Sequence, residues 1–481
     1  MISDVSTKQY RRNRSAPLTA LLALGLSIVT GTVVPAVAQS AGAVEIPLTF
    51  AEVRLEFYDA TLHVLLDASA LPFVRAFAEQ PGEQRRPAAI LISGGSNGIP
   101  TIRTTAPDRP GEDGARHIEV TIGAEQLVTV YGSGLQITAH EIETPHVTAP
   151  RGVHYDIEGS QLSSHGGRDT RVEARRSTVW MENSRGQLYL SVADSAAELA
   201  GHEGEAEIVA ATTEFTLTAS GRKLDVNLDG GSLFLGGGEG ELNLEAREAV
   251  VVVERWPGVL NVAGADSTLE IRQSHTAVRT QWSLGGSRQN ISLDEVTAQV
   301  TANLDGGRLD GRNLAGVVQV EARDLAVVEL SDLANKATLS LSGNSEATVS
   351  RAQGVDLTVG DSSVRIEDVH SLSVQGTGAD FYGSGVGRLG SFELTASQIE
   401  LDLSATSHPA SIRLTGPTDA RLDMTSPCMV RVTAATDAPS DPVNVTGCEL
   451  SMPGQPVGRM RAHIVTLELH GDVQVNATGR P

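Results

Sequence analysis

The sequence predicts an all-β protein that is built as a parallel β-solenoid, a fold in which short strands stack coil upon coil. The first observation is the stretch from Leu224 to Leu244, where apolar residues recur in three groups that start at Leu224, Leu233 and Leu242. Within each group they lie two positions apart, which is typical of a strand with one buried face. Two further observations, the shortness of such groups and the scarcity of hairpin turns, favour stacked coils.

The same rhythm continues from Ile118 to about His470, with groups that start mostly about 8 to 11 residues apart. Many groups contain only three residues, whereas ordinary strands run to about 5–6. An antiparallel meander is the alternative, but the dipeptides that close two-residue hairpins are too few for it. In a solenoid each short strand pairs with the coils on either side, and two steps predict a coil of about 20 residues.

Residues 39–116 have a different pattern of apolar and polar residues and are expected to form an N-terminal β-rich cap. They contain longer alternating runs and polar loops with Pro and Gly. Leu71–Gln80 fits either a helix or a strand. A cap is needed because an open coil offers unpaired backbone groups to other chains. The solenoid is then assigned to residues 117–470 and a C-terminal tail to residues 471–481.

Residues 1–38 have the pattern of a secretory signal. A basic start precedes an apolar run from Leu18 to Val34, and Ala36-Val37-Ala38 predicts cleavage between Ala38 and Gln39. Arg11-Arg12 leaves a twin-arginine signal as a minor alternative. No later stretch is apolar for long enough to span a bilayer, so we expect a bacterial protein exported to the periplasm or the cell exterior.

The composition is strongly acidic. The whole chain has a formal net charge of −22, and removing residues 1–38 takes away four positive charges and one negative charge, which gives −25. Such a surface repels nucleic acids and anionic membranes. Aromatic residues make up 4% of the chain, which suits thin stacked coils better than a thick layered core.

Cys428 and Cys448 are the two cysteines of the chain, and their separation of 20 residues matches the coil length inferred from the strand rhythm. Adjacent coils lie about 4.8 Å apart, within the range that a disulfide tolerates. Export makes oxidation possible. We therefore expect a disulfide between adjacent coils, with two unpaired thiols as the alternative.

The segment from Ile118 to Ile137 combines an alternating strand, a leucine-led strand and a Gly-Ser-Gly turn at residues 132–134. In this it resembles the bacterial auto-transporter adhesins with a head GIN domain, over about residues 118–244. The resemblance implies an exported β-solenoid and carries over no catalytic residue.

Two glycine motifs have the spacing of enzyme sites but the wrong context. Gly94–Gly98 fits the G-x-S-x-G pattern of a hydrolase, yet the residues after it alternate like a strand, and Asn97-Gly98 favours a hairpin. Gly385–Gly390 fits G-x-G-x-x-G, but a strand rather than a helix is expected after it. We interpret the first as a hairpin and the second as a coil corner.

Three other patterns in the sequence are similar to binding sites. Gly236–Leu244 is similar to a calcium-binding nonapeptide, but Leu242 stands where an Asp must supply the carboxylate. The histidines between His140 and His165 are too irregularly spaced for one strand face, so exposed loop positions are expected rather than a metal site. The tryptophans could stack on sugars, and because Trp256 precedes a Pro-Gly turn, at least one of them is expected to be exposed. The histidines and tryptophans in question are His140, His146, His154, His165, Trp180, Trp256 and Trp282.

These observations predict a non-enzymatic, adhesin-like or envelope scaffold protein of unknown ligand, with a cell-surface polysaccharide or an envelope protein as partner. No catalytic, cofactor or metal residue is assigned. The alternative is a polysaccharide lyase or glycoside hydrolase on a β-helix, since fold alone does not decide function.

Overall fold

The structure is a computed structural model. It describes residues 45–480 except 68–69, 79–85, 88–89, 95–98, 105–114, 124–125, 143–151, 219–221, 239, 274–279, 437–441 and 454–462. Ala38 and Gln39, the expected cleavage site, lie outside the described residues.

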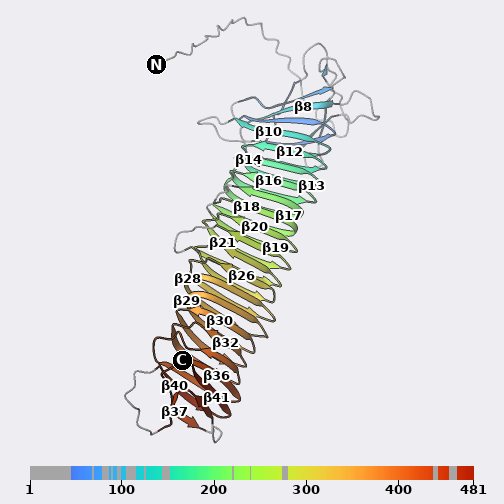
Figure 1. Cartoon of the computed structure of the whole chain (residues 1–481). Helices are drawn as coiled ribbons and strands as arrows, with labels where there is room; N and C mark the ends of the chain where they lie inside the picture. Colours follow the sequence, from blue (N-terminus) through green and yellow to red (C-terminus); the bar gives the residue numbers. More distant parts are fainter. Residues whose placement is uncertain are drawn as a thin grey trace, which may run out of the picture.

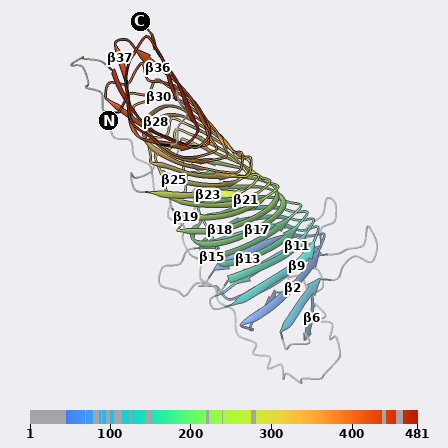
Figure 2. The same ribbon diagram turned by 90° about the horizontal axis from the view of Figure 1, so that it is seen from below.

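The described residues form a rod of stacked parallel strands, which confirms the predicted solenoid (Figure 1). Strands make up 76% of the structure, and the described part contains no helix. Each coil contributes one strand to each of two sheets, which we call sheet A and sheet B (Figure 2). Along the chain the strands alternate between the two sheets, so that β10 pairs with β12 and β11 with β13.

Sheet A runs through the following strands, in spatial order from the N-terminal end of the rod: β2 (Glu52–Tyr58), β9 (Leu127–Ser133), β11 (Gly152–Glu158), β13 (Arg168–Arg175), β15 (Arg185–Ala193), the first halves of β17 (Glu203–Thr218) and β18 (Lys223–Gly236), β19 (Glu241–Arg247), β21 (Val259–Ala265), β23 (Gln281–Ser287), β25 (Gln299–Asp305), β27 (Val318–Arg323), the second halves of β28 (Val327–Leu341) and β29 (Glu346–Gly360), β31 (Ser371–Thr377), β33 (Arg388–Thr395), β35 (Ala410–Thr415), β40 (His463–His470) and β37 (Cys428–Thr436).

Sheet B contains the shorter partners, in the same order: β3 (Thr61–Asp67), β10 (Gln136–Ile142), β12 (Gln161–His165), β14 (Thr178–Glu182), β16 (Ala196–Ala200), the second halves of β17 and β18, β20 (Val250–Glu254), β22 (Thr268–Arg272), β24 (Asn290–Asp294), β26 (Arg308–Arg312), the first halves of β28 and β29, β30 (Ser363–Val369), β32 (Asp380–Ser384), β34 (Gln398–Asp402), β36 (Thr418–Thr425), β41 (Val473–Arg480) and β38 (Val443–Thr446).

The coil is shorter than the predicted 20 residues. Ser232 pairs with Val250 and Glu241 with Val259, so equivalent positions on neighbouring coils are 18 residues apart in the sequence. The nine-residue rhythm of the sequence is therefore half a coil, one strand with one corner. The estimate of 20 came from the cysteine spacing and from the irregular strand groups.

The core is a single apolar layer between the two sheets. Leu224, Val226 and Leu228 point inward from sheet A, and Leu233 and Leu235 point inward from sheet B; all five are at most 4% exposed. Burial of these side chains supplies the main driving force for stacking, at about 25 cal/mol per Å² of apolar surface. Residues between them point outward, as Phe234 does.

Each coil turns sharply twice, and the corner residues adopt a left-handed backbone. At the corner that leads from sheet A to sheet B these include Arg176, Asp194, Thr212 and Glu248, all with φ of 48–50°. A left-handed L-residue costs about 1–2 kcal/mol, so each corner needs compensating interactions.

Much of this compensation comes from a ladder of buried hydroxyl groups, which we call the corner ladder. The residue after the left-handed position is often Ser or Thr, and its side chain points inward. Ser177 Oγ donates a hydrogen bond to the carbonyl oxygen of Arg175 (2.7 Å) across its own turn, and accepts one from the N–H of Ser160 (3.1 Å) on the neighbouring coil. Ser195 repeats the arrangement toward Ser177 (3.1 Å). The corner ladder includes Ser160, Ser177, Ser195, Thr213, Ser267, Ser362, Ser397 and Thr418.

The region assigned to an N-terminal cap contains strands, but the coils begin earlier than expected. β2 and β3 pair in parallel with β9 and β10, so residues 52–67 already form a coil. The cap proper covers the end of this coil. It contains β1 (Glu45–Pro47), β4 (Phe73–Ala78), β5 (Arg86–Pro87), β6 (Ile90–Gly94), β7 (Pro100–Thr104) and β8 (Ala115–Ile122), with β4 antiparallel to β8. The segment Leu71–Gln80, whose sequence fits either a helix or a strand, thus contains the strand β4.

At the C-terminal end, the order of coils in space differs from their order in the sequence. β40 lies between β35 and β37, and β41 lies between β36 and β38. The expected tail at residues 471–481 is therefore wrong for Val473–Arg480, which form an internal strand. The guanidinium of Arg480, at the end of β41, donates a hydrogen bond to the buried carboxylate of Asp423 (2.5 Å). This contact holds the end of β41 against β36.

The predicted disulfide between Cys428 and Cys448 is present, with a Cα–Cα distance of 4.8 Å. Met429 in β37 pairs with Glu449 in β39 (Glu449–Ser451), so the two cysteines lie on successive layers, as expected.

We predict that Ser177→Ala lowers the free energy of unfolding by about 1–3 kcal/mol, because it leaves the N–H of Ser160 without its partner. Hydrogen exchange should show faster exchange near Ser160, since each coil contacts mainly its neighbours. Ser340→Ala, at an exposed outward position of β28, is the matched control and should change little. Equal effects of the two substitutions would contradict the role of the corner ladder.

We predict that reduction of Cys428–Cys448 destabilises the C-terminal layers alone. Opening a loop of 20 residues removes about 3 kcal/mol of stabilisation in the chain-entropy model. Hydrogen exchange should increase in β37–β41 and stay unchanged before β30. Titration of the unfolded, unreduced protein with a thiol reagent is the direct check, and two free thiols per chain would refute the bridge.

Candidate functional site

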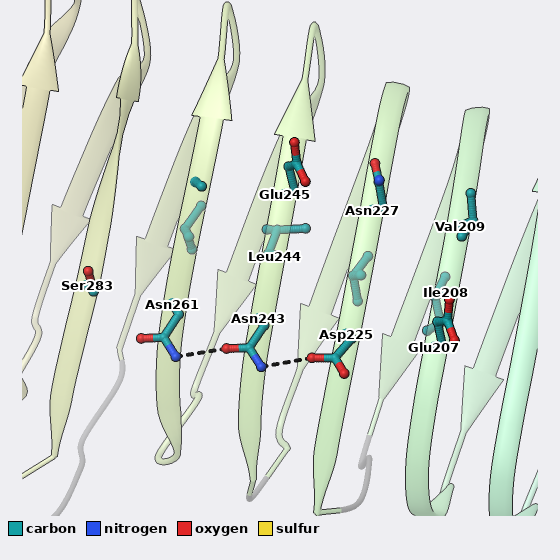
Figure 3. Close-up of a pocket in the computed structure, with 13 residues that line it drawn as sticks. Glu207, Ile208, Val209, Asp225, Asn227, Asn243, Leu244, Glu245, Asn261 and Ser283 are labelled. Atoms are coloured by element: carbon teal, nitrogen blue, oxygen red, sulfur yellow. Dashed lines mark hydrogen bonds between the residues drawn. The ribbon is translucent and has the colours of Figure 1, made fainter.

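A depression lies on the outer face of sheet A, where it crosses β17, β18, β19, β21 and β23 (Figure 3). Its volume is about 600 Å³, and it is open to solvent along its length. Its lining residues are Glu207, Ile208, Val209, Asp225, Val226, Asn227, Asn243, Leu244, Glu245, Asn261, Val262, Ala263 and Ser283.

The register of sheet A brings these residues together. Glu207, Asp225, Asn243, Asn261 and Ser283 occupy one position on five successive strands and form one column. Because neighbouring strands lie about 4.8 Å apart, a column presents one side chain at each such step along the rod.

A second column runs beside the first, two residues further along each strand. It contains Val209, Asn227, Glu245, Ala263 and Gly285. The small residues at the end of this column make the surface hollow there. Gly286, on the same strand, packs against the backbone of Gly264, where a side chain would collide with the carbonyl oxygen of Gly264.

The first column contains a chain of side-chain hydrogen bonds, which we call the amide ladder. Asn261 Nδ2 donates to Asn243 Oδ1 (2.8 Å), and Asn243 Nδ2 donates to Asp225 Oδ1 (2.8 Å), as drawn in Figure 3. Asn243 uses its second N–H on Glu241 Oε1 (3.2 Å). All three side chains of the amide ladder are thus held in one orientation.

Asp225 anchors the amide ladder as an ionised carboxylate. The hydrogen bond from Asn243 lowers the pKa of Asp225 below its ordinary value, and Lys223, whose Nζ lies 3.0 Å from Asp225 Oδ2, acts in the same direction. A lowered pKa means that the carboxylate form is favoured at neutral pH.

The depression continues toward the N-terminal end of the rod. A second hollow of about 390 Å³ shares Glu207 and Asp225 with the first, and a third of about 590 Å³ shares Gln187 and Glu205 with the second. We call the three together the trough. It spans seven strands of sheet A, from β13 to β23, or about 29 Å at the usual strand spacing.

In the N-terminal half of the trough, the lining residue Arg171 is already paired. The Arg171 guanidinium lies 4.2 Å from the ring centroid of Tyr189 and 2.6 Å from Glu173. The hydrogen bond from Arg171 lowers the pKa of Glu173. His154 lies on the coil before Arg171, and burial lowers its pKa.

His140, His154 and His165 do not meet at one site, but they lie on strands β10, β11 and β12 and not in the expected loops. His140 and His165 stack on sheet B with ring centroids 5.5 Å apart, and His165 Nδ1 lies 3.3 Å from Glu182. His154 belongs to sheet A, and His146 lies outside the described residues. Within the described ranges, no group of three or more His, Cys, Asp or Glu residues could hold a metal ion.

The expectation of an exposed tryptophan is met by Trp180 and not by Trp256, the one beside the turn. Trp256 and Trp282 are each 1% exposed, and the Trp256 ring covers Gly238, where a side chain would collide with it. The turn after Trp256 directs the ring inward, and its indole N–H donates to the carbonyl oxygen of Val259 (3.3 Å). Trp180 on sheet B is the exposed tryptophan, at 39%.

Both glycine motifs have the predicted structure. β6 and β7 pair antiparallel, with Gly94 opposite Pro100, as the hairpin interpretation requires, although residues 95–98 of its turn are outside the described part. Gly385 has a φ of 65° at a coil corner, and β33 follows as a strand.

The sequence interpretation missed the trough. Its signal was the recurrence of Asp225, Asn243 and Asn261 at intervals of 18 residues, which becomes meaningful only when the coil length is known.

Comparison of the chain with protein-family models, with curated proteins and with solved structures gives no match. The resemblance to adhesins with a head GIN domain therefore stays a prediction. Among the described residues, no helix has the length and apolar character needed to cross a membrane.

We predict that Asn243→Ala raises the pKa of Asp225 toward the ordinary value of an aspartate, because it removes the largest cause of the shift. The lowered pKa stabilises the fold above the ordinary aspartate pKa, and this contribution is lost as the pH falls through the lowered value. A carboxyl NMR titration of labelled aspartates measures the change. Asn227→Ala, in the second column, is the control, and an Asp225 pKa that does not respond to Asn243→Ala would contradict the amide ladder.

Proposed function

We propose that this chain is an exported, non-enzymatic β-solenoid that binds an extended polymer along sheet A, as an adhesin-like or envelope scaffold protein. The trough is the observation that carries the proposal. It runs along the rod axis across seven strands, so it suits a long chain better than a compact molecule.

The acidic side chains of the trough support binding rather than hydrolysis. A glycoside hydrolase needs a carboxylic acid whose pKa is raised, so that it can protonate the leaving group. The pKa of Asp225 in the trough is shifted in the opposite direction by its hydrogen-bond donors, and so is the pKa of Glu173, which lies beside the trough and pairs with Arg171. Asp225 is held as a fixed hydrogen-bond acceptor, which is a property of a recognition surface.

Two features support export. The signal pattern of residues 1–38 precedes the solenoid in the sequence. The disulfide between Cys428 and Cys448 suits an oxidising compartment. Contacts between neighbouring coils hold the rod together, and the disulfide links its C-terminal layers. Such a rod can present a binding face away from the cell surface.

We predict that Ala263→Trp, which fills the depression at an exposed position, abolishes polymer binding. The assay is retardation of residues 39–481 in native gels that contain soluble polysaccharides or envelope extracts. Ser340→Trp is the matched control, because Ser340 lies in the same outward column four strands further along sheet A. Equal binding by the two variants, or release of reducing ends from the polysaccharide, would overturn the proposal.

A further inference from the structure

We infer that the polymer is an uncharged polysaccharide whose hydroxyl groups are bound by the amide ladder. This inference rests on the proposed function and names the chemical class of its ligand.

The hydrogen-bonding capacity left on the amide ladder matches hydroxyl groups. The described residues use one N–H of Asn261, for Asn243, which leaves the second N–H and the Oδ1 lone pairs of Asn261 for a ligand. Asn243 has both N–H groups engaged and keeps acceptor capacity on Oδ1. A hydroxyl group both donates and accepts, so it can use the free N–H and the free oxygen together.

The orientation of these amides is fixed before a ligand arrives. Each amide is held by its neighbour, and the chain ends on an ionised carboxylate that is itself paired with Lys223. A preorganised donor and acceptor loses little conformational entropy on binding. Such a fixed row favours a ligand with regularly repeated hydroxyl groups.

Charge excludes an anionic polymer. Of the thirteen residues that line the main depression, three are charged, and all three are acidic: Glu207, Asp225 and Glu245. Of the cations at the trough, Lys223 and Arg171 are engaged by Asp225 and Glu173, and Arg222 lines the third hollow, away from the main depression. A polyanion would meet three carboxylates in the main depression and a chain of net charge −22 around it.

The centre of the depression does not suit a polycation either. Asn243, Asn261, Asn227, Ala263 and Ser283 are uncharged, and the lowered pKa of Asp225 reflects partners that it already has. Ala263 and Gly285 are neighbours in the second column and place a small apolar patch beside Asn261 and Ser283. A sugar ring has the matching pair of surfaces, with C–H groups on its face and hydroxyl groups at its edge.

The test is titration calorimetry with three polymers of similar length: hydroxyethyl cellulose as the neutral probe, polygalacturonate as the anionic probe and chitosan as the cationic probe. We expect the neutral probe to bind with little dependence on salt. The double substitution Asn243→Ala and Asn261→Ala should weaken this binding by about tenfold or more. Asn444→Ala is the matched control, because Asn444 forms a similar amide contact with Asn476 (3.4 Å) outside the trough.

Asn261→Asp provides a second variant with nearly the same shape. It removes both N–H groups, the free one and the one donated to Asn243, and adds a negative charge, so it should weaken binding of the neutral probe and strengthen binding of chitosan. Circular dichroism checks that both variants keep the fold.

The possible results separate this inference from the proposed function. Binding of chitosan or polygalacturonate in preference to the neutral probe, lost at about 0.5 M salt and sensitive to Ala263→Trp, overturns the inference and leaves the trough as a polymer site. Neutral binding that is unchanged by the double substitution also overturns the inference. Absence of binding to all three probes and to envelope extracts overturns both.

Discussion

Stacking parallel coils at the strand spacing is the constraint on which the rest of this molecule depends. Each coil must reverse direction twice, and each reversal places backbone N–H and carbonyl groups in the interior, where an unpaired group costs about 1–3 kcal/mol. At many of the corners, the corner ladder pairs these groups with a Ser or Thr hydroxyl. Ser177 bonds both its own turn and the N–H of Ser160, so each layer completes the corner of its neighbour. The left-handed corner residues are tolerated because these bonds hold them.

The same constraint creates the candidate site. Since every coil repeats the register of the one before, the outward residues of sheet A stand in columns, and a run of similar side chains in one column becomes a continuous surface. Asp225, Asn243 and Asn261 form hydrogen bonds with each other only because 18 residues return the chain to the same position. In this fold the period of the coil determines both the core and the spacing of surface groups.

Patterns that depend on a single strand could be predicted from the sequence. The alternation of Leu224, Val226 and Leu228 identified the buried face, because strand geometry alone determines which way a side chain points. Properties that depend on the coil as a whole were predicted less well. The interval from Cys428 to Cys448 suggested coils of 20 residues, whereas the regular coils have 18. The burial of Trp256 could not be predicted, because its turn directs the ring inward over Gly238, and no local pattern records that packing. The order of β35, β40 and β37 in space was beyond prediction, because strand pattern does not specify which coil a segment joins.

That unusual order has a consequence for how the rod is completed. Coils between β9 and β34 can form one after another as the polypeptide emerges during synthesis, because each needs only the coil before it. The layer that contains Cys428 cannot dock on the rod in this way, since residues 463–480 occupy the place between it and β35–β36. The final layers must therefore assemble together, after residue 480 has emerged, and until then the growing end of the rod keeps an unpaired edge of backbone.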